Sequence, residues 1–258
     1  MTDLSPIDRA KRAAARAAAA HVEPGMRVGL GTGSTAAFLV HRLGERLREE
    51  GLRITAVPTS ERTAELARAE GIEIVTLGQA GWLDLTIDGA DEVDGELNLI
   101  KGGGGALLRE KIVATASDRV VIIADRAKKV GVLGAFPLPV EVIPFGWEVT
   151  RKLIEDLLAG LDVQGRGTVL RMRDGGPFVT DQGNHIIDLH LQRIGDARQL
   201  ALLLNQIPGV VENGLFLDIC DTLILGAEDE SVEVTDLSQV PDAAPVTAVD
   251  NIFSEVSD

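Results

Sequence analysis

The residue types best suited to chemistry gather between positions 88 and 111, in the sequence DGADEVDGELNLIKGGGGALLREK. Asp88 and Asp91 follow the apolar run LDLTI, which is typical of a buried strand. Ligands of open α/β sheets usually bind at the carboxyl ends of the strands. The sequence therefore predicts that these two carboxylates lie at a ligand-binding edge.

A glycine-rich loop follows the acidic residues, with Lys101 directly before glycines 102 to 105. Because glycine has no side chain, the backbone there can approach a ligand and turn its N–H groups toward an anion. The next residues, ALLREKIVATA, favour a helix that places Glu110 about one turn inside it. We therefore expect carboxylates and one cation to converge beside a backbone anion site.

Each of these features also has an interpretation without chemistry. The segment DGADEVDG, residues 88–95, is often a solvated turn or a weak cation-binding loop, and a run of glycines is often a flexible hinge. Glu110 lies between Arg109 and Lys111, with which it would form local ion pairs on an exposed helix. Their occurrence within one short stretch favours a functional site.

A second candidate site lies near the N-terminus, where residues 26–31 predict a buried strand that leads through GTGST into an amphipathic helix. Gly33 supplies the turn. Backbone N–H groups and the hydroxyls of Thr32, Ser34 and Thr35 would then meet at a helix N-terminus. Such a position favours a bound phosphate.

The same succession of strand, glycine turn and helix also occurs in dinucleotide-binding folds. Those sites place an acidic residue at the end of the second strand, where it holds the ribose hydroxyls. Here the second strand, expected at 53–58, is followed by Thr59 and Ser60. The sequence therefore favours a single phosphate over a nicotinamide nucleotide.

Strands and helices alternate through the first half of the chain, which predicts an α/β fold with a mainly parallel, Rossmann-like sheet covered on both faces. A fifth strand, expected at 119–125, leads into ADRAKK. That loop brings Lys128 to the same sheet edge as the other candidates. The tail at 221–237 is expected to return to this sheet, with the acidic last residues loosely held.

From Pro137 onward the pattern changes to β-α-β-β-α-β, which is typical of a small ferredoxin-like α+β domain. We therefore expect a large α/β catalytic domain of residues 1–136 and 215–258, and a small domain of residues 137–214.

Composition narrows the classes of partner. The formal net charge of −15 disfavours nucleic acids and anionic membranes. Cys220 is the only cysteine, so no intrachain disulfide forms. The histidines show no metal-binding spacing. With no signal peptide and no apolar run long enough to span a bilayer, a cytoplasmic protein is expected.

Six segments resemble type A ribose-5-phosphate isomerases, in that family's order and spacing over nearly the whole chain. They are GLGTGSTAAF at 29–38, PTSERT at 58–63, TIDGADEVD at 86–94, LIKGGGGALLREK at 99–111, IADRAKKV at 123–130 and FPLPVEVIP at 136–144. The resemblance implies interconversion of D-ribose 5-phosphate and D-ribulose 5-phosphate through an enediolate, in the non-oxidative pentose phosphate pathway. It also implies a homodimer that needs no cofactor and no metal.

The resemblance further implies a role for each candidate catalytic residue. Glu110 corresponds to the proton acceptor, and Asp88 is a candidate for ring opening and for proton relay between the oxygens. Asp91 would orient hydroxyls, and Lys101 would stabilise the oxyanion. Lys11 either reaches the phosphate or lies on a solvated helix face. The implied substrate-binding residues are Thr32, Gly33, Ser34, Thr35, Asp88, Gly89, Ala90, Asp91, Lys101, Gly102, Gly103, Gly104 and Lys128.

Two alternatives of other kinds remain open. Related α/β domains serve as sugar-phosphate effector modules of transcription regulators, which would keep the phosphate loop but need neither Glu110 nor Lys101. Such modules are normally fused to a DNA-binding segment, and no helix-turn-helix pattern precedes the α/β region. The other alternative is a different enzyme of the wider superfamily, an amino-sugar phosphate deaminase or a CoA transferase.

Overall fold

The computed structural model describes residues 4–237, and its largest sheet in that range has seven strands in the order β16-β15-β7-β4-β1-β2-β3. Neighbouring strands are parallel, except that β16 runs antiparallel to β15. These strands are β1 (Arg27–Leu30), β2 (Thr55–Pro58), β3 (Glu73–Ile74), β4 (Leu85–Gly89), β7 (Val120–Asp125), β15 (Thr222–Gly226) and β16 (Val232–Asp236). The prediction of a mainly parallel sheet is confirmed.

Helices cover both faces of this sheet. The helices are α1 (Pro6–Ala19), α2 (Ser34–Glu49), α3 (Glu61–Ala69), the short α4 (Leu77–Ala80) and α5 (Leu107–Thr115). Strand β7 is apolar at every position but the last, because its side chains alternate between two cores. Val121 and Ile123 pack in the core under α1 and α2, whereas Val120 and Ile122 pack on the opposite side with Leu107 of α5.

A four-stranded antiparallel sheet is built from the segment between Leu138 and Asn213, in the order β13-β8-β12-β9. Its elements are β8 (Leu138–Val142), α6 (Trp147–Leu158), β9 (Gly167–Leu170), β12 (His185–His190), α7 (Ala197–Leu204) and β13 (Val210–Asn213), with a hairpin of β10 (Met172–Arg173) and β11 (Gly176–Pro177). This is the β-α-β-β-α-β order expected of a ferredoxin-like unit. We propose that residues 137–214 form a domain of their own.

A third, small sheet was not predicted. It pairs β5 (Glu92–Val93) with β6 (Leu99–Ile100), and β6 with β14 (Leu215–Phe216). Residues that looked like an open acidic loop are therefore a hairpin tied to a strand far along the chain. This pairing fixes the position of Lys101, which directly follows β6.

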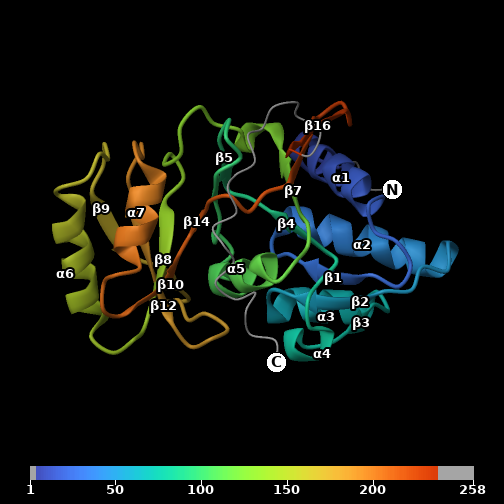
Figure 1. Cartoon of the computed structure of the whole chain (residues 1–258), viewed down its shortest axis with the longest axis horizontal. Coiled ribbons are helices and arrows are strands. Elements are labelled where there is room, and N and C mark those ends of the chain that lie inside the picture. Colours follow the sequence, from blue (N-terminus) through green and yellow to red (C-terminus); the bar gives the residue numbers. More distant parts are fainter. Residues whose placement is uncertain (1–3, 238–258) are drawn as a thin grey trace, which may run out of the picture.

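Helix α5 lies between the two larger sheets, as Figure 1 shows. It contacts β4 on one side and β8 and β13 on the other. Residues 221–237 return to the large sheet as expected, and the prediction for the acidic end falls outside the described residues. No helix within residues 4–237 is long and apolar enough to cross a membrane.

Candidate active site

The candidate site lies at the carboxyl ends of β1, β4 and β7, which are neighbours in the large sheet. Parallel strands bring these ends to one edge, so Thr32 after β1 comes next to Asp88 near the end of β4. The approach is close enough that a Cβ added at Gly31 would lie 2.0 Å from Oδ1 of Asp88. Only glycine fits at position 31 without displacing this carboxylate.

Asp88 is buried and held by the backbone. Its Oδ1 accepts hydrogen bonds from the N–H groups of Thr32 (3.1 Å) and Gly89 (2.7 Å). Its Oδ2 lies 3.0 Å from Nζ of Lys101. Burial raises the pKa of Asp88 despite the opposing effect of Lys101 and the backbone donors. The carboxyl is therefore fixed in place, and it binds a proton more readily than an exposed aspartate would.

Lys101 is the cation at the centre of the site, with only 3% of its side chain exposed. Its Nζ donates to the carbonyl of Gly89 at 2.6 Å and lies 3.4 Å from Oε1 of Glu110. Burial opposes its positive charge, but Asp88 and Glu110 outweigh burial and raise the pKa of Lys101. The ammonium therefore keeps its charge inside the protein.

Glu110 sits in the first turn of α5 and faces inward, with 3% of the residue exposed. Its Oε2 is buried and accepts no hydrogen bond from any residue in the described range. Burial raises the pKa of Glu110 to about 8, with Lys101 acting against the shift and Asp88 adding to it. A carboxyl with this pKa and a bare oxygen is suited to taking up a proton near neutral pH.

The interpretation of Glu110 as a surface residue in local ion pairs is wrong. Its neighbours in the sequence pair with other carboxylates: Arg109 with Glu61 at 2.8 Å, and Lys111 with Glu212 at 2.9 Å. They lie outside the buried cluster because successive residues on a helix point in different directions. Glu110 alone of the three turns into the site.

The glycine loop meets Asp91. The N–H of Gly103 donates to Oδ2 of Asp91 at 2.7 Å, and a Cβ at Gly103 would lie 2.7 Å from the other carboxylate oxygen. A turn closed by the Gly105 N–H and the Gly102 carbonyl, at 2.9 Å, holds the loop. The loop is thus an ordered part of the site, which excludes the hinge interpretation.

Helix α2 provides an anion cradle. It starts at Ser34 after Gly33 (φ 113°), with no side chain capping its N–H groups. Within residues 4–237, the N–H groups of Ser34 and Thr35 donate to no backbone carbonyl, so they remain free to bind an anion. The hydroxyl of Thr32 does not join them, because it bonds to Thr59 at 2.7 Å and to Ser60 at 2.9 Å.

One cavity of about 120 Å³ joins the cradle to the buried cluster. Its lining is Lys11, Thr32, Gly33, Ser34, Thr35, Gly89, Ala90, Asp91, Lys101, Gly102, Gly104, Glu110 and Lys128. Of the predicted residues, Asp88 and Gly103 lie behind this lining and reach the cavity through Lys101 and Asp91. Lys128 lies on the 3₁₀ turn Arg126–Lys128, which follows β7, and lines the cavity as expected. Lys11 of α1 lines the cavity too.

The family model for ribose 5-phosphate isomerase A (phosphoriboisomerase A) matches residues 55–230. A ribose-5-phosphate isomerase A of Ruegeria sp. (strain TM1040) is 65% identical, over 99% of each chain. The chain belongs to the ribose-5-phosphate isomerase A family.

Solved structures agree with this assignment. A D-ribose-5-phosphate isomerase in complex with phospho-erythronic acid superposes with a TM-score of 0.83 at 40% identity, covering 89% of this chain and 99% of the other. The ribose 5-phosphate isomerase A of Methanocaldococcus jannaschii gives a TM-score of 0.80 at 41% identity, covering 88% and 97%. The fold inferred from the sequence is therefore that of the family.

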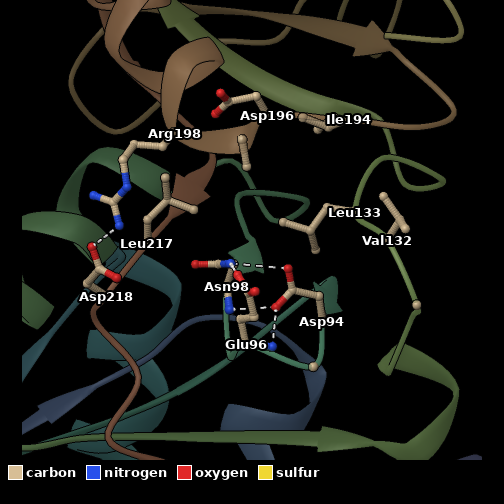
Figure 2. Close-up of a pocket in the computed structure, with 14 residues that line it drawn as sticks. Asp94, Glu96, Asn98, Val132, Leu133, Ile194, Asp196, Arg198, Leu217 and Asp218 are labelled. Atoms are coloured by element: carbon tan, nitrogen blue, oxygen red, sulfur yellow. Dashed lines mark hydrogen bonds and ion pairs between the residues drawn. The ribbon is translucent and has the colours of Figure 1, made fainter. Parts of the chain in front are cut away.

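A larger cavity of about 500 Å³ lies elsewhere, between the β5–β6 hairpin and the start of α7 (Figure 2). Its lining includes the acids Asp94, Glu96 and Asp196, and its arginine, Arg198, is paired with Asp218. Such a surface repels a phosphate. The smaller cavity, where lysines and free N–H groups meet, is therefore the better candidate for a sugar-phosphate site.

The sequence did not reveal two contacts that support this candidate site. The hydroxyls of Thr59 and Ser60 fix Thr32, and the segment PTSERT contained them without indicating this contact. Arg171, from the small sheet, donates to the carbonyls of Gly102 and Gly103. No local sequence pattern indicates the second contact, because Arg171 lies 69 positions from Gly102 and 68 positions from Gly103.

Proposed function

We propose that this chain interconverts D-ribose 5-phosphate and D-ribulose 5-phosphate, with Glu110 as the base that moves the proton between C1 and C2. The observation that carries the proposal is the buried, unpartnered Oε2 of Glu110, which lies in the same cavity as Lys101 and the anion cradle. Membership of the family over the full chain supports the reaction.

The phosphate is proposed to bind at the N-terminus of α2. There the N–H groups of Ser34 and Thr35 and the positive end of the helix dipole attract an anion. Lys11 and Lys128 line the same cavity, and neither forms an ion pair with another residue of the range 4–237. Together they supply the local positive charge that a chain of net charge −15 needs in order to hold an anionic substrate.

The proton transfer follows from the buried cluster. Glu110 removes the proton from C2 of the open-chain aldose, and the C–H electron pair forms the enediolate. The charged Nζ of Lys101 stabilises the oxygen that becomes negative. Asp88 moves a proton between the two oxygens after assisting ring opening, while Asp91 holds the hydroxyls. Glu110 then returns its proton to C1, which gives the ketose.

The direct test is the formation of ribulose 5-phosphate from ribose 5-phosphate, with and without a chelator. We expect turnover at the same rate in both conditions, because lysine and backbone donors can stabilise the enediolate. Loss of turnover on chelation would contradict the metal-free mechanism. Tight binding of ribose 5-phosphate without turnover would instead favour an effector-binding module.

We further propose that the chain assembles as a homodimer, as the resemblance implies. Strands β9 and β13 form the edges of the four-stranded sheet, and an edge strand can pair with a strand of a second copy. Sedimentation equilibrium at micromolar concentration should give twice the monomer mass, and a monomer would refute the proposal. A cytoplasmic location stays a prediction, which cell fractionation would test.

A further inference from the structure

Arg171 reaches from the small sheet to the back of the glycine loop. It lies between β9 and β10, and its Nη1 donates to the carbonyl of Gly102 at 2.9 Å and to that of Gly103 at 3.2 Å. A single guanidinium nitrogen therefore binds two consecutive peptide groups of the loop that borders the candidate active site.

Asp188, on β12, holds the other side of the same guanidinium. Its Oδ2 accepts from Nε of Arg171 at 2.9 Å, and its Oδ1 accepts from Nη2 at 2.5 Å. The pair is largely screened from water, with 16% of the Arg171 side chain and 17% of the Asp188 side chain exposed. A two-point contact of this kind fixes the plane of the guanidinium as well as its position.

The consequence for the active site follows from peptide geometry. The peptide group is planar, and in its trans form the C=O and the N–H point in opposite directions. The carbonyls of Gly102 and Gly103 point at Arg171, so the N–H groups of Gly103 and Gly104 point away from it. The first of these donates to Asp91 at 2.7 Å, and Gly104 lines the cavity.

We propose that Arg171, clamped by Asp188, is a positioning residue for the isomerisation. It sets two peptide planes so that the Gly103 N–H fixes Asp91 and the Gly104 N–H faces the sugar oxygen on which negative charge grows. The guanidinium also polarises both peptides, which strengthens their N–H groups as donors. This inference rests on the proposed function, because the donors matter most for an enediolate.

The decisive variant is Arg171→Met, which keeps an unbranched, flexible stem but donates no hydrogen bond. Removing one oxyanion donor costs about 10² to 10³-fold in kcat, so misaligned donors should cost about 10 to 100-fold. KM and the inhibition constant of inorganic phosphate should change less than about 3-fold, because ground-state binding of the phosphate is untouched. Asp188→Asn should lower kcat by a smaller factor than Arg171→Met does. The double variant should have the same kcat as Arg171→Met alone, because Asp188 acts only through Arg171.

Arg173 offers a matched control. Its guanidinium lies 4.3 Å from the centroid of the Phe178 ring, which Arg171 also approaches at 5.9 Å. Within the described chain, Arg173 makes no hydrogen bond to the glycine loop. Arg173→Met should therefore leave kcat unchanged. Arg171→Lys should recover part of the loss, because an ammonium can serve one carbonyl, and this variant decides the matter if the methionine variant fails to fold.

A second readout does not depend on turnover. The amide ¹H–¹⁵N signals of Gly103 and Gly104 should shift in Arg171→Met and not in Arg173→Met. If the wild-type chain shows no isomerase turnover, the proposed function fails and these signals alone test the positioning. An Arg171→Met variant with wild-type kcat and unshifted glycine signals overturns the inference. So does a variant whose only change is a lower melting temperature.

Discussion

The buried cluster holds two carboxylates, Asp88 and Glu110, around one ammonium, Lys101. One positive charge neutralises only one of the two, so the second carboxyl is stable in the interior only with a proton. The pKa values of both carboxyls are raised by burial, and they interact too closely to titrate independently. The cluster can therefore bind and release one proton with little rearrangement, which is what an enediolate reaction requires.

Replacing Glu110 with Gln tests the base directly. Gln keeps the size of the side chain but cannot accept a carbon-bound proton, and general base catalysis contributes about 10² to 10⁴-fold in rate. Turnover should fall by at least that factor while ribose 5-phosphate still binds. Exchange of the substrate carbon proton with deuterated solvent should also disappear. Retained exchange would point to Asp88 as the base.

The pH dependence of the wild-type enzyme gives an independent check. Only the ionised form of Glu110 accepts a proton, and its pKa is raised to about 8. Hence kcat/KM should rise with pH through the neutral range, reach half its maximum near pH 8 and level off about one pH unit higher. A profile already flat from pH 5 upward would show that the base has an ordinary carboxyl pKa.

The two lysines of the cavity should differ in kinetic effect. In the proposed mechanism Lys101 meets charge that appears in the transition state, so Lys101→Ala should lower kcat by about 10² to 10³-fold. Lys128 is proposed to meet phosphate charge already present in the ground state, so Lys128→Ala should mainly raise KM. Steady-state kinetics of both variants provide the measurement. If both change only KM, the role of Lys101 is wrong.

At the scale of elements, α5 is held from both sides by the residues that flank Glu110. Arg109 lies 2.8 Å from Glu61 at the start of α3 and 3.6 Å from Asp181, in a loop of the small unit. Lys111 donates to Glu212 at 2.9 Å and to the carbonyl of Asn213 at 2.7 Å. These contacts fix the position and rotation of the helix, and with them the direction of Glu110.

Lys111→Met should therefore destabilise the protein. Burial lowers the pKa of Lys111 against the effect of Glu212, and each side chain is 17% exposed. Loss of the lysine leaves Glu212 partly buried without its charged partner, which costs about 1–3 kcal/mol. Denaturant unfolding should show the loss, and Lys111→Met with Glu212→Gln should recover part of it.

Lys152 is the matched control for this prediction. It forms an exposed i,i+4 pair with Asp156 on α6, and such pairs contribute little. Lys152→Met should leave the unfolding midpoint almost unchanged. Equal losses in the two variants would show that the Lys111 contact is an ordinary surface pair.

The sequence predicted those elements whose patterns are long. The apolar runs before Asp88 and Asp125 indicated β4 and β7, and helix-forming residues indicated α5. Strands β5, β6 and β14 were missed, because a strand of two residues shows no periodicity in the sequence. Strand β14 also pairs with β6 from more than a hundred positions away. Most of the candidate residues line one cavity, but Asp88 and Gly103 lie behind its lining, and their roles stay predictions. The burial of Glu110 was not predictable locally, because the distant strands β8 and β13 contact its helix.

At the scale of the whole molecule, stability should fall as pH rises from about 5 to 8. The carboxyls of Asp88, Glu110, Glu141 and Asp221 have pKa values raised mainly by burial. An unfolded chain has carboxyl pKa values near 4, whereas the pKa of Glu110 in the folded protein is about 8. At any pH between these two pKa values, the folded state binds more protons than the unfolded chain. Raising the pH through this window therefore lowers the free energy of unfolding.

Thermal melts at several pH values and salt concentrations measure this effect. Salt should reduce the pH dependence that comes from repulsion between surface charges in a chain of net charge −15. It should leave the pH dependence that comes from the buried carboxyls. Glu110→Gln should flatten the fall, because Gln resembles the protonated acid at every pH. A melting temperature that rises steadily from pH 5 to pH 8 would contradict the raised pKa values.

The position of α5 between the two larger sheets bears on how this enzyme could be redesigned. A shortened catalyst made of the large sheet alone would keep the phosphate cradle and Asp88. It would lose Glu212, the partner that anchors Lys111, and Arg171, the support of the glycine loop. Grafting the site onto another scaffold would thus require transplanting both halves of the chain together.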